Sequence, residues 1–266
     1  MKSIDINCDM GEVPEAIADG TQEALMPFLT SVNIACGGHA GDERTMAATI
    51  AQAIRWKLAI GAHPGYPDRA NFGRNERELP LDVVSHLVFH QVQCLAGIAA
   101  DHGIPLAHVK AHGALYNQAV NNRELAAAIA AGVSHYSRDL VLVGMAGSPM
   151  LEVFREAGFA TAAEAFVDRR YEPDGTLRSR KFNDALLADP AAAVQQALRI
   201  ANRAGVIASD GSDLGVNAQT LCIHSDTPGA PHIAAAVAQA LRNEGFTLRS
   251  RHSISRGSTI AGTLSR

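Results

Sequence analysis

The segment Ser3-Ile-Asp-Ile-Asn-Cys-Asp-Met-Gly-Glu12 sets a pattern that recurs along the chain. A short run with β-strand character, Ser3 to Cys8, leads into a polar cluster that ends at Glu12. Further strand-like runs alternate with longer stretches that favour helix, which predicts a parallel α/β fold. These runs are Val32 to Cys36, Leu58 to Ala62, Ala107 to Ala111, Leu140 to Met145, Phe159 to Ala163 and Thr220 to Ile223.

The stretches between the strand-like runs have the composition and end residues of helices. We expect helices over Asp42 to Trp56, Pro80 to His102, Asn122 to Ala131 and Pro190 to Ala204. Asp42 is predicted to be the N-cap of its helix, and Asp226, which precedes Thr227-Pro228, is a second N-cap candidate.

About seven strand units without an intervening Gly/Ser/Pro linker fit one (β/α) barrel, a TIM-like fold with about seven parallel strands. We expect this single domain to span residues 1–248, followed by a basic C-terminal tail, residues 249–266. An open doubly wound sheet is the alternative. No G-x-G-x-x-G follows the first strand and no Walker-type loop occurs, which argues against a Rossmann or P-loop nucleotide site.

Composition excludes several classes of protein. Of the 266 residues, 47% are hydrophobic and 19% charged, which is enough apolar content to bury a core. A net charge of −4 predicts no nucleic-acid partner. The start of the chain lacks a signal-peptide core, and we expect no membrane span. The separated cysteines Cys8, Cys36, Cys94 and Cys222 indicate neither a disulfide framework nor a structural zinc site, so we expect a cytoplasmic protein.

Polar side chains cluster where the predicted strands end. In a (β/α) barrel these ends meet at one mouth, where active sites are built. Histidine, lysine and carboxylate groups gathered there would suit proton transfer, metal ligation and activation of a water molecule. The candidates are Asn7, Asp9, Glu12, Asn33, His39, His63, Lys110, His112, Tyr116, Glu164, Arg169 and His224.

Each candidate also has a purely structural interpretation. A single histidine at a strand end is as readily a hydrogen-bonded core residue as a functional group. A functional role is favoured only because four histidines, His39, His63, His112 and His224, share this position. His86 and His90 have the i, i+4 spacing of a metal pair, but they lie within a predicted helix, away from the strand ends, and are expected to be surface or packing residues. Cys36 is expected to be a small buried side chain rather than a nucleophile.

Six ordered motifs within residues 3–248 resemble those of the LamB/YcsF family. They are Asp5-Ile-Asn-Cys-Asp-Met-Gly-Glu12, Asn33-Ile-Ala-Cys-Gly-Gly-His-Ala-Gly-Asp42, Ile60-Gly-Ala-His-Pro-Gly-Tyr-Pro-Asp68, Val109-Lys-Ala-His-Gly-Ala-Leu-Tyr-Asn117, Asp168-Arg-Arg-Tyr171 with Asp174-Gly-Thr-Leu177, and Cys222-Ile-His-Ser-Asp226. The resemblance implies a distorted barrel of the glycoside hydrolase/deacetylase type. It also implies one component of an ATP-dependent 5-oxoprolinase, which with subunits B and C opens 5-oxoproline to L-glutamate while ATP becomes ADP and phosphate.

Five positions depart from the family's usual pattern, and none of them removes a histidine or carboxylate from the predicted mouth. They are Gly38 for Phe, Glu43 for Pro, Asn75 for Arg, Ala111 for Pro and Ser225 for Gly. The loss of a large aromatic side chain at Gly38 is expected to reshape the pocket.

Opening a lactam suggests roles for these residues. Asp9 or Glu12, or else His63 or His112, is the candidate general base toward water, and Lys110 would stabilise negative charge or hold the substrate carboxylate. Arg169 is a second candidate carboxylate clamp. The candidates for substrate binding are Asn7, Asn33, His39, Tyr116, Glu164, Arg169 and His224.

A divalent metal enters by fold analogy alone. Deacetylases of this barrel type hold one with an Asp after the first strand and His residues after the next strands, and Asp9, His39 and His63 occupy comparable places. Two other functions therefore remain open: a self-sufficient metal-dependent deacetylase or amidase, and a non-catalytic lactam-binding component of a complex. The sequence is also compatible with a homo-oligomer.

Overall fold

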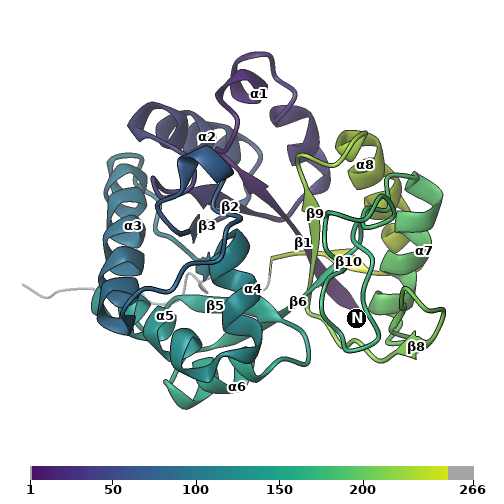
Figure 1. Cartoon of the computed structure of the whole chain (residues 1–266). Coiled ribbons are helices and arrows are strands. Elements are labelled where there is room, and N and C mark those ends of the chain that lie inside the picture. Colours follow the sequence, from purple (N-terminus) through teal and green to yellow (C-terminus); the bar gives the residue numbers. More distant parts are fainter. Residues whose placement is uncertain (1, 251–266) are drawn as a thin grey trace, which may run out of the picture.

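The computed structural model describes residues 2–250, which form a closed barrel of seven parallel strands (Figure 1). Neighbouring strands pair in chain order as far as β6, and β9 then pairs with both β6 and β1. This confirms the predicted barrel and excludes the open doubly wound sheet. The strands are β1 (Ser3–Met10), β2 (Ser31–Ala35), β3 (Ala59–His63), β4 (His108–Lys110), β5 (Val141–Met145), β6 (Thr161–Phe166) and β9 (Thr220–His224).

Helices surround the barrel, and the four predicted helices all form, as α2, α3, α5 and α7. Three further helices of eight residues or more, α4, α6 and α8, were not predicted. The helices are α1 (Pro14–Ala18), α2 (Glu43–Arg55), α3 (Leu81–Asp101), α4 (Gly113–Asn121), α5 (Arg123–Tyr136), α6 (Pro149–Glu156), α7 (Pro190–Ala201) and α8 (Ala230–Asn243), with 3₁₀ turns η1 (Glu23–Phe28) and η2 (Arg69–Asn71).

The predicted N-caps have different outcomes. Asp42 caps α2, because its side chain accepts a hydrogen bond from the backbone N–H of Thr45, whose hydroxyl in turn accepts one from the Asp42 backbone N–H. The prediction for Asp226 is wrong, because Gly229 occupies the N-cap position of α8. The Asp226 carboxylate instead pairs with two arginines at the barrel mouth.

The barrel is distorted between β6 and β9. After β6 the chain runs through a long irregular segment, then α7, then a small antiparallel ribbon of β7 (Val206–Ile207) and β8 (Asp213–Leu214). The short strand β10 (Thr247–Leu248) pairs with the start of β1. Of the predicted basic tail, residues 251–266 lie outside the described residues.

One helix, α3, is long and apolar enough by length and composition to span a membrane, which the sequence analysis did not foresee. In the structure α3 packs against α5, α2 and β3. Its residues Val84, Val88, Val92 and Leu95 are fully buried. The place of α3 in the helical layer therefore accounts for its buried apolar face, while Leu81 and Val83 are exposed.

Strand β1 carries polar side chains into the barrel and apolar ones outward, because successive residues of a strand face opposite sides. In β1, Asp5, Asn7 and Asp9 contact polar groups of neighbouring strands inside the barrel. The intervening Ile4, Ile6, Cys8 and Met10 belong to the apolar core. Side chains of β1 thus alternate between the polar interior of the barrel and the apolar core beneath the helices.

Candidate active site

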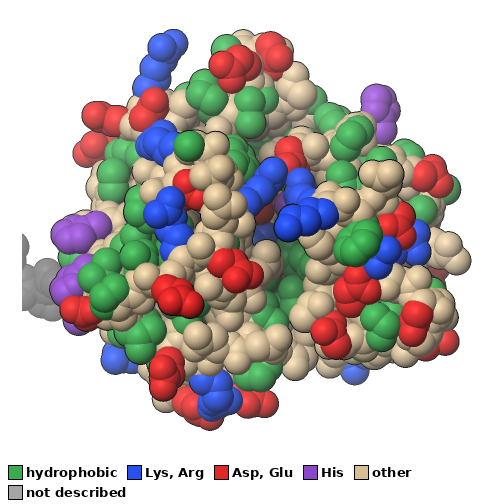
Figure 2. All heavy atoms as spheres, in the orientation of Figure 1, with side chains coloured by type: hydrophobic (Ala, Val, Ile, Leu, Met, Phe, Trp, Pro, Cys, Tyr) green, Lys and Arg blue, Asp and Glu red, His purple; other side chains and the backbone are tan. Residues whose placement is uncertain are grey.

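A cavity of about 580 Å³ opens at the C-terminal ends of the strands. Figure 2 shows Lys and Arg side chains gathered around the hollow at the centre of this face. Eight of the candidates line this cavity: Asp9, Glu12, His63, Lys110, His112, Tyr116, Arg169 and His224. Four others, Asn7, Asn33, His39 and Glu164, do not line it but contact residues that do.

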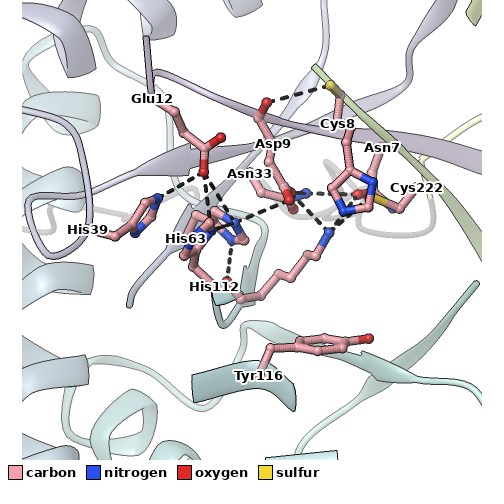
Figure 3. Close-up of polar contacts among 12 residues, drawn as sticks. Asn7, Cys8, Asp9, Glu12, Asn33, His39, His63, His112, Tyr116 and Cys222 are labelled. Atoms are coloured by element: carbon pink, nitrogen blue, oxygen red, sulfur yellow. Dashed lines mark hydrogen bonds and ion pairs between the residues drawn. The ribbon is translucent and has the colours of Figure 1, made fainter. Parts of the chain in front are cut away.

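Glu12 is the centre of a histidine cluster (Figure 3). Its Oε1 atom lies 2.9 Å from His39 Nε2 and 3.2 Å from His112 Nδ1, and His63 Nε2 is 3.8 Å away. Burial alone would raise the pKa of this carboxyl, but hydrogen bonds and charge from His112 and His39 outweigh burial and hold it well below its usual range. Glu12 is therefore a buried carboxylate shared by three imidazoles.

Two of these histidines are fixed by backbone carbonyls. His63 Nδ1 lies 2.7 Å from the Lys110 carbonyl oxygen, and His112 Nε2 lies 2.8 Å from that of Phe72. A carbonyl only accepts, so each of these nitrogens must carry a proton. The two remaining nitrogens, His63 Nε2 and His112 Nδ1, are 3.0 Å apart. If both rings are neutral, two lone pairs face each other, so this position calls for an extra proton or a metal cation.

The charges around His63 favour a cation at that position. Its Nε2 atom lies 3.3 Å from Asp9 Oδ2. Burial on its own would lower the pKa of His63, yet the neighbouring carboxylates of Asp9 and Glu12 outweigh it and leave the pKa above its ordinary value. His39 differs, because burial lowers its pKa to about 4.

The donor set fits a divalent metal ion. Glu12, His39, His63 and His112 each offer one ligand atom, and these atoms lie within 4.8 Å of one another. One carboxylate oxygen and three imidazole nitrogens suit Zn²⁺ or a similar transition metal. Compared with the set suggested by fold analogy, His39 and His63 remain, while Glu12 and His112 take the place of Asp9.

Asp9 instead binds Lys110. Its Oδ1 atom lies 3.0 Å from Lys110 Nζ, and on the other side Glu164 Oε1 lies 2.8 Å from the same ammonium. Burial lowers the pKa of Lys110, but the two carboxylates and Cys222 outweigh it and raise the pKa well above the ordinary value. Asp9, Cys222 and His224 form a second group at metal-ligand spacing, but Lys110 Nζ lies 3.2 Å from Cys222 Sγ and already supplies a cation there.

Asp168 was not among the predicted site residues, although it begins the quoted motif Asp168-Arg-Arg-Tyr171. It lies 3.0 Å from His224 Nδ1 and also accepts hydrogen bonds from the His224 backbone N–H and the Thr227 hydroxyl. Because Asp168 holds Nδ1 of His224, the Nε2 atom is the one left for the cavity. The motif was the available signal, since a buried Asp that orients a histidine is a common arrangement.

Arginines gather at the rim of the cavity. Arg169 is only 7% exposed and donates one hydrogen bond to the Arg178 carbonyl oxygen, while its Nε atom is buried with no partner among the described residues. Burial and the nearby Arg180 lower the pKa of Arg169 to about 10. Arg74 and Arg180, which sequence reasoning missed, both pair with Asp226, at 2.6 and 2.7 Å.

Below the mouth lies a second polar layer, the barrel floor, made of Asp5, Asn7, Asn33 and His108. The Nδ2 atom of Asn33 donates to Asn7 and Asp9, both at 2.8 Å, and its Oδ1 atom lies 2.7 Å from His108 Nε2. Asp5 accepts from the hydroxyls of Thr30, Ser31 and Thr220. The barrel floor holds Asp9 in position from below.

Gly38 does not line the cavity. A Cβ atom there would lie 2.4 Å from both the Gln91 side-chain oxygen and the Gly65 carbonyl oxygen, so Gln91 fills the space. Among the departures from the family pattern, Asn75, Ala111 and Ser225 do line the cavity. The departures from the family pattern that reach the cavity are therefore these three and not Gly38.

Comparisons with known proteins agree with the fold. The family model of the LamB/YcsF family matches residues 4–256. The chain is 45% identical over 249 residues to the A subunit of 5-oxoprolinase from Chloroflexus aggregans, covering 94% of this chain and 99% of that protein. It is 46% identical over 243 residues to the protein of the same name from Methylococcus capsulatus, covering 91% and 92%.

Among solved structures, the lactam utilization protein from Thermus thermophilus matches with a TM-score of 0.86 and 39% identity, over 93% of this chain and 99% of that one. A putative cellobiose-phosphate cleavage protein from Enterococcus faecalis shares the fold alone, with a TM-score of 0.51, 17% identity and coverage of 94% and 97%. A match along nearly the whole length, on a barrel whose mouth carries the quoted motifs, shows that this chain belongs to the LamB/YcsF family.

Proposed function

We propose that this chain is the component of an ATP-dependent 5-oxoprolinase that carries the hydrolytic site. In a complex with subunits B and C it would open 5-oxoproline to L-glutamate, while ATP is hydrolysed to ADP and phosphate. Relatives named as the A subunit of 5-oxoprolinase support this role in a complex. The observation that carries the proposal is the pair of opposed nitrogens of His63 and His112, 3.0 Å apart beside Glu12, in the wall of the cavity.

His63 is suited to activate water. Its Nδ1–H is held by the Lys110 carbonyl, so Nε2 is the atom that can take a proton, and Asp9 would stabilise the resulting imidazolium. The water oxygen forms a bond to the lactam carbonyl carbon as its proton passes to His63. Lys110, which lines the cavity, would stabilise the negative charge that develops on the carbonyl oxygen.

Ring opening then needs a proton on the leaving nitrogen. As the bond between carbonyl carbon and nitrogen breaks, the leaving nitrogen takes from the imidazolium of His63 the proton that came from water. The products are a carboxylic acid and an amine in one molecule, and transfer of the acid proton to the amine gives the ionised form of glutamate. Arg169 would bind the α-carboxylate of the substrate, because its Nε is an unused donor at the cavity wall.

A divalent metal held by Glu12, His39, His63 and His112 would bind the lone pair of His63 Nε2, so with a metal present His63 would be a ligand and not the base. The metal would then supply the polarisation of the lactam carbonyl and lower the pKa of a bound water. This donor set also favours a second candidate function, a self-sufficient metal-dependent amidase. That function predicts turnover by the isolated chain without ATP. Metal analysis of the purified protein, with activity measured before and after chelation, tests the metal site.

The test is reconstitution with purified partner subunits, following release of glutamate and of ADP. We expect turnover only with the partners and ATP, and strong losses for the single substitutions Asp9→Asn, His63→Ala, Lys110→Met and His112→Ala. Wild-type glutamate production by all four variants would contradict the proposal. In that case a rise in melting temperature with 5-oxoproline would indicate that the chain binds the lactam without catalysing its opening.

A further inference from the structure

A second cavity, of about 990 Å³, lies on the side of the barrel over the outer face of β6. Residues of α6 form one wall, and the end of α7 with the residues after it forms the other; Figure 1 shows the two helices on either side of β6. α6 packs mainly against α5, and α7 against α8, so the helical layer is interrupted here. Thr161 and Ala163 of β6, half-buried, form part of the groove floor.

The charge of this groove has one sign. Its lining includes Lys2, Arg155, Arg203 and Arg249 and contains no Asp or Glu. The three arginines are exposed, and their side chains form no hydrogen bond or ion pair with the residues that the structure describes. Uncompensated cations around a groove raise the local concentration of anionic groups and favour an acidic ligand.

Acidic residues near the groove do not line it. Glu244 reaches its edge, where Oε1 accepts from Nδ2 of the lining residue Asn202 at 3.5 Å, and the acidic residues of α6 are paired elsewhere. Glu152 and Glu156 of α6 bind Arg123 of α5, at 3.0 and 2.8 Å, on the side of α6 away from the groove. Arg155, one residue before Glu156, lines the groove instead. The groove therefore keeps its positive charge although the whole chain has a net charge of −4.

We propose that this groove docks an acidic segment of a partner subunit, and the proposal rests on the multisubunit function proposed above. The chain's own residues 251–266 follow directly after Arg249 and Ser250, but they carry Arg251, Arg256 and Arg266 and no acidic residue, so like charges oppose their binding. The apolar Leu151 and Phe246, which also line the groove, would contact the apolar side chains of such a segment. No residue lines both this groove and the cavity at the mouth.

The test compares two double charge reversals in the full chain. Arg155→Glu/Arg203→Glu changes the groove, whereas Arg44→Glu/Lys57→Glu makes the same change of charge at exposed residues that do not line it. The dissociation constant with separately purified B and C subunits is measured by sedimentation, and folding is checked by circular dichroism. We expect the groove variant to bind at least about 10-fold more weakly at low salt, the control to match wild type, and the gap to narrow at high salt.

The outcomes separate this proposal from the proposed function. Equal affinities of the groove variant and wild type, or no binding of wild type to either partner, overturn the docking site. A small-anion site would replace the docking site if all variants bound the partner subunits equally and inorganic phosphate raised the melting temperature of wild type but not that of the groove variant. The 5-oxoprolinase function is judged separately, from ATP-dependent glutamate release by wild type with its partners.

Discussion

The barrel interior has two polar layers that differ in how completely their groups are hydrogen-bonded. In the barrel floor, Asn33 uses both its amide and its carbonyl, and Asp5 accepts from three hydroxyls. At the mouth, Nε2 of His63 and Nδ1 of His112 face each other, 3.0 Å apart. The Nε atom of Arg169 has no partner among the described residues. A saturated network fixes structure, whereas buried groups without partners are destabilising and mark the place where a ligand would complete the bonding.

This difference predicts that substitutions in the two layers have different readouts. A buried polar group that lacks a partner costs roughly 1–3 kcal/mol of stability. Changes at the mouth should therefore lower activity by more than any loss of stability accounts for, while changes in the floor should lower stability first. The following predictions test that division.

The largest effect is expected for Glu12→Gln. Removing the charge that Glu12 shares with His39 and His112 should lower glutamate release by about 10²–10⁴-fold in the reconstituted complex. The free energy of unfolding in urea should also fall, by up to roughly 3–5 kcal/mol, because His39 and His112 lose the buried charge that they share. Activity is therefore compared under conditions where circular dichroism shows both proteins folded. Glu15→Gln, at an exposed position of α1, is the control. Activity within twofold of wild type would place Glu12 outside the reaction.

The barrel floor should respond to Gly61→Ala. The added Cβ would lie 2.2 Å from His108 Nε2, so the His108 ring would be pushed away from Asn33. Overpacking of this kind lowers the free energy of unfolding by about 1–3 kcal/mol, measurable in urea. Gly97→Ala in α3, where no atom lies within 4 Å, should instead stabilise by about 0.5–1 kcal/mol. Equal stabilities of the two variants would refute the tight fit of the floor.

Arg169→Lys tests the unpaired donor at the rim. Lysine keeps the charge but cannot offer two parallel N–H groups to a carboxylate, so KM for 5-oxoproline should rise about 10-fold while kcat changes less. The neighbouring Arg170→Lys, whose side chain does not line the cavity, should leave both constants near wild type. A fall in kcat alone, with KM unchanged, would show that Arg169 does not bind the ground-state carboxylate.

The sequence predicted the strands, and the residues that gather at their C-terminal ends, better than it predicted how far below the mouth each side chain lies. Strand runs that end in polar clusters are local signals, and all seven strands form. Depth depends on register between strands, which is a tertiary property. Asn7 and Asn33 were predicted to bind substrate, but neither lines the cavity. Their side chains bind each other, and Asn33 also binds His108.

The orientation of the histidines could not be predicted either. The ring of His112 is fixed by the carbonyl of Phe72, a residue with a φ of 55°, in a loop that follows β3. That of His63 is fixed by a carbonyl on β4. Both partners are backbone atoms, distant in sequence, that carry no residue-specific signal.

Asp226 shares features of both polar layers: it lies at the mouth, but like the groups of the barrel floor it is fully paired, here with Arg74 and Arg180. Burial raises the pKa of Asp226, but Arg180 outweighs burial and leaves the pKa below its ordinary value. A depressed folded-state pKa means that the stabilisation is present above the unfolded value of about 3.9 and is lost as pH falls through the folded one. Asp226→Asn should therefore cost about 1 kcal/mol in urea unfolding at neutral pH, and the difference from wild type should shrink below about pH 4. The exposed Asp101→Asn is the control, and a difference for Asp226→Asn that grows on acidification would show that the two arginines do not stabilise its charged form.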